Sequence, residues 1–175
     1  MSAPAISVAR KLIKVVPTMV ADNNADNDVA FNWVVIPSVS SSNGNPVKLV
    51  SVAIYDPGVS LGNLELYFCR GAGASGTAPT TAQGLINDGT AGSAATDITA
   101  AEGTTIVICG SVLITHDDAA GLITAGVSTA SNINLIMSPA SSSTGLYVSG
   151  LWRSDPADNS SSGNTTMDIY LGFED

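Results

Sequence analysis

The sequence predicts an all-β fold, namely a two-sheet antiparallel β-sandwich of jelly-roll-like architecture with an extended N-terminal arm. Two observations predict it. In six segments apolar and polar residues alternate with a period of two, as in strands that bury one face, and a seventh strand-like segment is apolar on both faces. The intervening segments are rich in Ser, Thr, Asn and Gly, which favour turns over helices. Strands with one apolar face must bury those faces together, and two packed sheets achieve this.

The length of the chain suits one sandwich. Its 175 residues fall within the usual range for one domain. A chain of this size buries roughly 70% of its unfolded surface, so neither a disulfide nor a metal is needed to hold a core. We therefore expect two parts, an N-terminal arm over residues 1–17 and a β-sandwich domain over residues 18–175.

The arm has a pattern with two interpretations. Residues 6–16 carry basic residues on both strand faces, and four apolar residues in them would also share one helical face. Val15, Val16 and Pro17 disfavour the end of a helix, so we expect an extended segment that forms an eighth strand. The four residues of the alternative helical face are Ile6, Ala9, Ile13 and Val16.

The first strands of the body are predicted at residues 29–36 and 46–56. In the first, alternate residues are apolar and are expected to share one face. In the second, three aliphatic residues lie opposite Lys48. Between the two strands, Asn43-Gly44 is a strong hairpin turn signal. The two apolar faces consist of Val29, Phe31, Trp33 and Val35, and of Val50, Val52 and Ile54.

Two further strands are predicted in the middle of the chain. Residues 63–70 alternate between aliphatic or Phe residues and Glu65 and Tyr67. Residues 104–115 are apolar on both faces, which is typical of a central strand covered on both sides. About thirty residues rich in Gly, Ala and Thr separate them, at 71–103.

The last three strands are predicted at residues 132–137, 146–153 and 167–174. The final one alternates most regularly, from Met167 to Phe173. A long polar connection, residues 154–164, precedes it. We expect no helix longer than two turns, and residues 117–125 are the segment where an exception would fall.

The charge of the chain is strongly uneven. The net charge is −9, from 15 acidic and 6 basic residues. Arg10, Lys11 and Lys14 precede every acidic residue, so the arm carries +3 and the rest −12. Nucleic-acid binding needs a large basic surface, so we expect none. The basic residues indicate either a contact with an acidic partner or an edge strand protected by charge.

No segment approaches the ~20 apolar residues that cross a membrane. Lys14 and Pro17 also interrupt the first apolar stretch, which is too short for a signal peptide. We therefore expect a protein that folds in the cytoplasm where it is made and has no membrane partner.

Two cysteines, Cys69 and Cys109, lie in predicted strands. Two thiols are too few for a zinc site. They are either small buried residues or a bridge between neighbouring strands.

Three short motifs invite functional interpretations that their surroundings do not support. Residues 71–76 match G-x-G-x-x-G, but no helix is predicted after them to hold a pyrophosphate. Residues 22–28 have alternating Asp and Asn like the first half of a calcium loop, yet Asn27 replaces the turn glycine and Trp33 the final Glu. His116 adjoins two Asp residues without a second His or an evident nucleophile. We expect no catalytic site, metal or cofactor.

The aromatic residues have two possible roles. Trp33 and Trp152 are expected in the core. Tyr67, Tyr147 and Tyr170 are expected to point outward and to form interface contacts.

Several segments resemble small virion structural proteins of tailed bacteriophages, especially marine phages and cyanophages. They cover about half of the chain and contain no chemical motif. The segments are SVARKLIKVVPTM, PVKLVSVAIYDPG, NLELYFCRG, NLIMSPASSSTGLYVSGLWRS and IYLGFED.

The resemblance implies a head decoration (cement) protein, a class that includes jelly-roll folds mounted as oligomers on the capsid. It implies the major capsid protein as partner, a homo-oligomer with a trimer preferred, and a place on the outer capsid surface. Arg10, Lys11 and Lys14 would make the capsid contact. The alternative is a tail or head-fibre module that binds host glycans through exposed loops.

Overall fold

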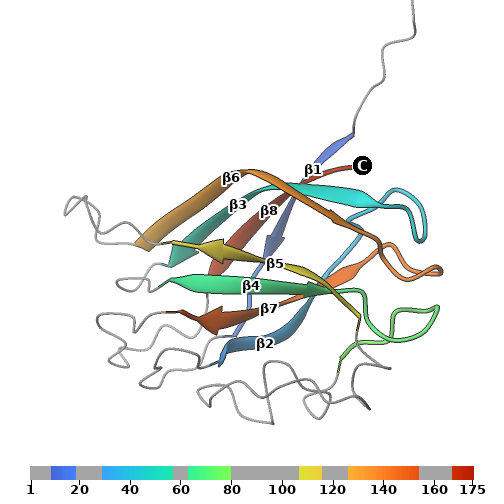
Figure 1. Cartoon of the computed structure of the whole chain (residues 1–175), viewed down its shortest axis with the longest axis horizontal. Coiled ribbons are helices and arrows are strands. Elements are labelled where there is room, and N and C mark those ends of the chain that lie inside the picture. The colour runs from blue at the N-terminus through green and yellow to red at the C-terminus, as the bar shows by residue number, and fades with distance from the viewer. Residues whose placement is uncertain (1–8, 19–28, 57–62, 80–106, 116–125, 154–166) are drawn as a thin grey trace, which may run out of the picture.

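The computed structural model describes residues 9–18, 29–56, 63–79, 107–115, 126–153 and 167–175. These residues form two four-stranded antiparallel sheets that pack face to face as a β-sandwich, without a helix (Figure 1). The fold class predicted from the sequence is confirmed at this level. The strands are β1 (Arg10–Val15), β2 (Val29–Ile36), β3 (Val47–Asp56), β4 (Leu64–Cys69), β5 (Ile108–Ile114), β6 (Gly126–Met137), β7 (Leu146–Trp152) and β8 (Asp168–Glu174).

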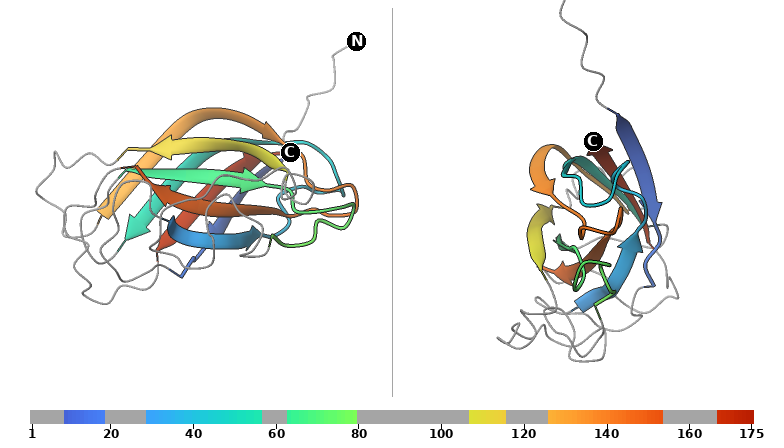
Figure 2. Two further views of the ribbon diagram at one scale, coloured as in Figure 1. Left: turned by 60° about the horizontal axis from the view of Figure 1, so that its bottom comes forward. Right: turned by 90° about the vertical axis from the view of Figure 1, so that its right-hand side faces the viewer.

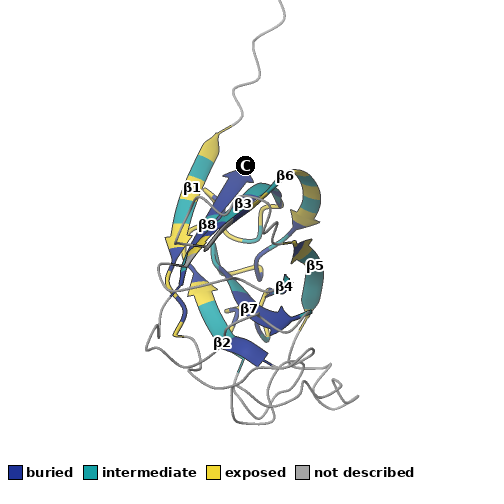
Figure 3. Cartoon of the chain, turned by 90° about the vertical axis from the view of Figure 1, so that its left-hand side faces the viewer, coloured by how far each residue is buried: buried dark blue, intermediate teal, exposed yellow. Residues whose placement is uncertain are grey.

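One sheet has the order β1-β8-β3-β6 and the other the order β2-β7-β4-β5. The core lies between them (Figure 2), and in strands such as β1 and β4 more buried residues alternate with more exposed ones (Figure 3). Phe31, Phe68 and Phe173 are its largest fully buried side chains. This arrangement satisfies the period-two pattern, since each apolar face meets the apolar face of the opposite sheet.

The basic segment near the N-terminus forms the edge strand β1. All six of its residues pair with β8, from Arg10 opposite Glu174 to Val15 opposite Ile169. Val15 is buried, whereas Leu12 is 70% exposed on the outer face. The eighth strand is therefore confirmed, and residues 10–15 of the expected arm belong to the sandwich. Residues 1–8 lie outside the described residues.

The predicted apolar face of β2 was wrong, because of its four residues only Phe31 belongs to the main core. The register of β2 against β7 shifts between Val29 and Phe31 and again between Phe31 and Val34. Each irregularity breaks the alternation that places residues on one face. Consequently Phe31 lies in the main core, but Trp33 packs in a separate small cluster with Val29, Leu151 and Tyr67, and Val35 is exposed.

The predicted position of β5 was also wrong. It is an edge strand that pairs only with β4 in its sheet. Its apolar outer face does not mark a strand covered on both sides, because Leu113 is 50% exposed. Residues 104–106 of the predicted strand lie outside the described part, as do residues 117–125, where a helix was considered.

The Asn43-Gly44 turn does not close a hairpin. Gly44 has φ +69° and its amide donates to the Ser143 carbonyl at 2.9 Å. However, β2 and β3, which flank the turn, belong to different sheets. The turn signal was correct, but its role is to carry the chain from one sheet to the other. Among the described residues no helix is long and apolar enough to cross a membrane.

Candidate functional site

The outer face of the β1-β8-β3-β6 sheet carries rows of side chains that run across its strands. The register places Arg10, Glu174 and Lys48 in one row and Leu12, Gly172, Ser51 and Ser131 in the next. The third row contains Lys14 and Tyr170. Large charged side chains thus stand beside a row in which the central residues are small.

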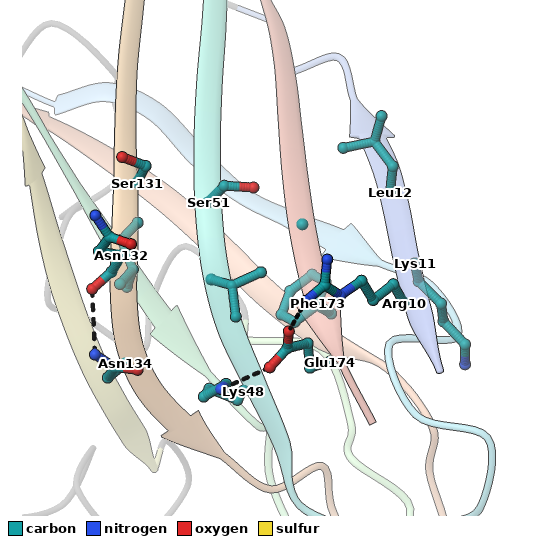
Figure 4. Close-up of a pocket in the computed structure, with 13 residues that line it drawn as sticks. Arg10, Lys11, Leu12, Lys48, Ser51, Ser131, Asn132, Asn134, Phe173 and Glu174 are labelled. Carbon is teal, nitrogen blue, oxygen red and sulfur yellow. Dashed lines mark hydrogen bonds and ion pairs between the residues drawn. The ribbon is translucent and has the colours of Figure 1, made fainter. Parts of the chain in front are cut away.

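This contrast produces a groove of about 590 Å³, which we call the basic groove (Figure 4). Gly172 keeps part of its floor open, because a Cβ at this position would require the Ser51 hydroxyl to rotate away. A register shift between Leu49 and Ser51 turns Ser51 to this face. The groove is lined by Arg10, Lys11, Leu12, Lys48, Val50, Ser51, Ser131, Asn132, Ile133, Asn134, Gly172, Phe173 and Glu174.

Glu174 is the central charged residue of the basic groove. Its Oε1 lies 3.0 Å from Arg10 Nη2, and its Oε2 lies 2.6 Å from Lys48 Nζ. Figure 4 shows the carboxylate between the two cations. The hydrogen bond from Lys48 is the main reason that the pKa of Glu174 lies below its ordinary value. Glu174 is therefore ionised at neutral pH and shared between two strands.

The three cations predicted for a capsid contact do not all share this arrangement. Lys14 lies on the same outer face, 2.6 Å from Asp168 Oδ2 and 5.6 Å from the centre of the Tyr170 ring. The hydrogen bond with Asp168 raises the pKa of Lys14. Lys11 alternates to the other face of β1, and its ammonium donates to the Ser38 carbonyl at 3.2 Å, 3.9 Å from Asp175 Oδ2. Arg10 and Lys14 thus accompany Lys48, which the sequence analysis had not selected.

Charge is concentrated on this sheet. Three of the six basic residues of the chain, Arg10, Lys14 and Lys48, lie on its outer face, and their ion pairs involve two carboxylates, those of Glu174 and Asp168. This set therefore carries a net charge of +1 on a chain with a net charge of −9. In the basic groove itself, Arg10 and Lys48 share one carboxylate, that of Glu174.

The three tyrosines proposed as interface residues lie on two different sheets. Tyr67 and Tyr147 are on the outer side of the β2-β7-β4-β5 sheet, whereas Tyr170 is on the outer side of the other. All three are half-buried. Tyr147 donates to the Gly76 carbonyl at 2.9 Å, and Tyr67 accepts a 2.7 Å hydrogen bond from Arg153. They cannot form one common contact surface.

A polar cluster occupies the outer face around Tyr67. Glu65 accepts hydrogen bonds of 2.6 Å from Ser111 Oγ and of 2.6 Å from Arg153 Nε. Burial acts to raise the pKa of Glu65, but the hydrogen bonds from Ser111 and Arg153 act against it, and the net pKa is lowered. A carboxylate held ionised by an Arg has little capacity to transfer a proton near pH 7, so the cluster joins strands rather than catalysing a reaction.

The glycine-rich motif at residues 71–76 forms a tight turn. Ala72 and Thr77 exchange backbone hydrogen bonds of 2.9 and 2.8 Å, and all three motif glycines have positive φ. The described residues after the turn, up to residue 79, are not helical. The described residues 71–79 therefore contain no helix N-terminus that could bind a pyrophosphate.

Cys69 and Cys109 are both free thiols. Burial raises the pKa of Cys69 to about 12, and it raises that of Cys109 as well. Neither is a thiolate at neutral pH, so neither is an activated nucleophile.

The remaining predicted motifs are not placed by the structure. The alternating Asp and Asn residues at 22–28 and His116 lie outside the described residues. Within the described part of the chain, no group of three His, Cys, Asp or Glu residues is arranged to hold a metal.

The sequence did not predict the basic groove. The basic residues near the N-terminus were noted from the sequence, but Lys48 lies on the outer face only because the register shift between Leu49 and Ser51 interrupts the alternation in β3. The register that aligns Arg10, Glu174 and Lys48 joins residues more than a hundred positions apart, and no local pattern contains it. No known protein family and no curated protein matches this chain.

Proposed function

We propose that this chain is a capsid decoration (cement) protein of a tailed bacteriophage, which binds the major capsid protein on the outer surface of the virion and stabilises the shell. The resemblance of five segments to small virion structural proteins supports this. The single structural observation that carries it is the location of three of the six basic residues, Arg10, Lys14 and Lys48, on one outer sheet face of an acidic chain. Such a surface orients binding to an acidic partner.

The strand order supports the same class of protein. We infer that the sandwich is a jelly roll, because the pairs β1–β8, β2–β7, β3–β6 and β4–β5 are those formed when one long hairpin is rolled into two sheets. Such a body is rigid and presents two broad sheet faces. One face can bind the shell while the other meets a second copy.

The opposite sheet is the candidate for contacts within a homo-oligomer, with a trimer as the expected form. Its outer face carries Tyr67 and Tyr147 and the exposed apolar residues Val35 and Leu113. Aromatic and aliphatic residues of this kind are enriched in interfaces. Several basic faces in one oligomer would bind the shell with avidity, and binding to the assembled shell alone stabilises that state.

A glycan-binding module of a tail or head fibre is the second candidate function. The hydroxyl and amide side chains of Ser51, Ser131, Asn132 and Asn134 in the basic groove favour it. Ligand sites of this type usually also present aromatic surface. The one aromatic residue that lines the groove, Phe173, is only 1% exposed, so we rank this function below capsid binding.

The test is co-sedimentation of the purified protein with capsids of the encoding phage from which it has been removed. We expect saturable binding to capsids and a higher temperature of capsid disruption. Intact host cells form the comparison sample. Binding to cells but not to capsids would establish the glycan function instead, and binding to neither would contradict both.

A further inference from the structure

We propose that the basic groove binds an extended acidic segment of the capsid partner, which lies across the strands and replaces Glu174 as the carboxylate bound by Arg10 and Lys48. The inference rests on the proposed function for the identity of the partner. It adds the location of the contact, the chemistry of the segment and the residue with which that segment competes.

The basic groove carries a net positive charge. Arg10 and Lys48 share a single carboxylate, Glu174. The ammonium of Lys11, the third basic residue of the lining, is paired with Asp175 instead. Because Glu174 compensates one positive charge but contacts two cations, the pair of cations retains one uncompensated charge. A carboxylate of the partner would neutralise this positive charge, whereas a cation of the partner would be repelled.

The exposure of these side chains makes the exchange possible. Arg10 is 80% exposed and Lys48 37%, while Glu174 is 16% exposed. A guanidinium has five N–H donors in a planar fork and binds carboxylates in pairs of hydrogen bonds. Arg10 can therefore turn towards an incoming carboxylate without disturbing the core. Until a partner binds, Glu174 remains the carboxylate that pairs with Arg10.

The uncharged lining fits a polypeptide. Ser51, Ser131, Asn132 and Asn134 supply hydroxyl and amide groups, which can bond the backbone of an extended chain. Asn132 has φ +58° and is exposed, as is Asn134 two residues later. Leu12 is 70% exposed at one end of the groove, where an apolar side chain of the segment can pack.

A second copy of this chain is the competing occupant, because it also carries acidic residues. The proposed homo-oligomer uses the outer face of the other sheet, which leaves the basic groove open to the capsid partner. The dimerisation measurement below distinguishes the two occupants.

The decisive variants change the competition within the groove. Glu174→Gln removes the internal carboxylate, so binding to capsids is expected to become several-fold tighter. Lys48→Gln removes one of the two cations and is expected to weaken binding about tenfold.

The matched control is Arg70→Gln, which also removes one positive charge but changes an exposed residue that follows β4 of the other sheet. The affinity of this variant for capsids should stay near that of wild type. If Glu174→Gln binds no tighter than wild type although it melts normally, the exchange is refuted.

A steric pair of variants tests the location independently of charge. Ser131→Trp places a bulky ring at the exposed wall of the groove and should abolish or strongly weaken binding. Thr129→Trp adds the same ring to the same face of β6, outside the groove, and should bind like wild type. Equal binding by both variants would place the contact elsewhere.

The outcomes separate the two proposals. If wild-type protein does not bind capsids, the proposed function fails. If wild type binds but the groove variants behave like their controls, the capsid function stands and the groove inference is wrong.

A blocked peptide of alternating Glu and Ala serves as a direct probe in titration calorimetry, and a Gln-Ala peptide is its control. Concentration-dependent dimerisation of wild type that Ser131→Trp removes would assign the groove to a second copy and overturn the inference.

Discussion

The ring of Phe31 lies directly against the backbone of Gly150 on the neighbouring strand β7. A Cβ at Gly150 would overlap the ring, so the fully buried phenylalanine occupies the volume that a side chain would need. The bulges in β2 bring Phe31 to this position. Two sequence-distant residues are thus fitted to each other in the core.

Gly150→Ala is therefore expected to destabilise the fold by about 1–3 kcal/mol, because Phe31 must move in a packed interior. Urea unfolding followed by circular dichroism measures the change. Gly73→Ala is the comparison, since a Cβ there meets nothing within 4 Å and the cost of its φ of +63° is about 1 kcal/mol. A smaller loss for Gly150→Ala than for Gly73→Ala would contradict the close contact.

The register of β1 can be tested by two truncations on one strand. Val15 is 4% exposed and packs in the core, whereas Leu12 is 70% exposed. Val15→Ala should cost about 2 kcal/mol of unfolding free energy, and Leu12→Ala less than about 0.5 kcal/mol. Equal effects would mean that residues 10–15 are not held in the sheet as an edge strand. For the same reason, deleting residues 1–16 removes a structural strand and is a poor test of partner binding.

Stability should fall on acidification. The pKa of Glu65 is lowered from 4.5 and that of Asp175 from 3.8, the latter by hydrogen bonds from Ser41. A depressed folded pKa gives stabilisation that is complete above the unfolded pKa and is lost as the pH falls through the folded value. Unfolding free energy should therefore be flat between about pH 5 and pH 8 and decrease below pH 4.5.

The variant Glu65→Gln isolates one part of this dependence. It should be less stable than wild type at pH 7, and the difference should shrink as the pH falls below 4.5, because protonated Glu65 no longer attracts Arg153. Thermal melts at several pH values give the comparison. A difference that stays constant with pH would show that the ionised form of Glu65 is not what stabilises the cluster.

The cysteines should resist alkylation in the folded protein. With a pKa of about 12, about one in ten thousand Cys69 side chains is a thiolate at pH 8. Cys109 is less buried and should react first. Iodoacetamide labelling with mass spectrometry should find little modification at Cys69 until denaturant is added. Rapid labelling of Cys69 in native protein would contradict its burial.

The strands were predictable from sequence because alternation is a local property. Residues 29–36 were bounded as observed, and the final strand differs by one residue at its start. The errors arose where a non-local partner decides the outcome. The bulges of β2 move Trp33 out of the main core through its pairing with β7, and β5 lies at an edge although its composition suits a central strand.

The candidate site was less predictable than the fold for the same physical reason. The sequence indicated that Arg10 and Lys14 belong to a distinctive basic segment, and the structure places both on one outer face. It did not indicate that Glu174 would bridge Arg10 to Lys48, because this depends on β8 lying between β1 and β3. Strand order follows from the packing of the whole chain.

Arg10 and Glu174 also lie opposite each other at one end of adjacent strands, so the chain enters and leaves the sandwich at a single corner (Figure 1). That corner borders the groove. A purification tag or a fluorescent protein joined to the chain before β1 or after β8 would therefore be attached next to the basic groove.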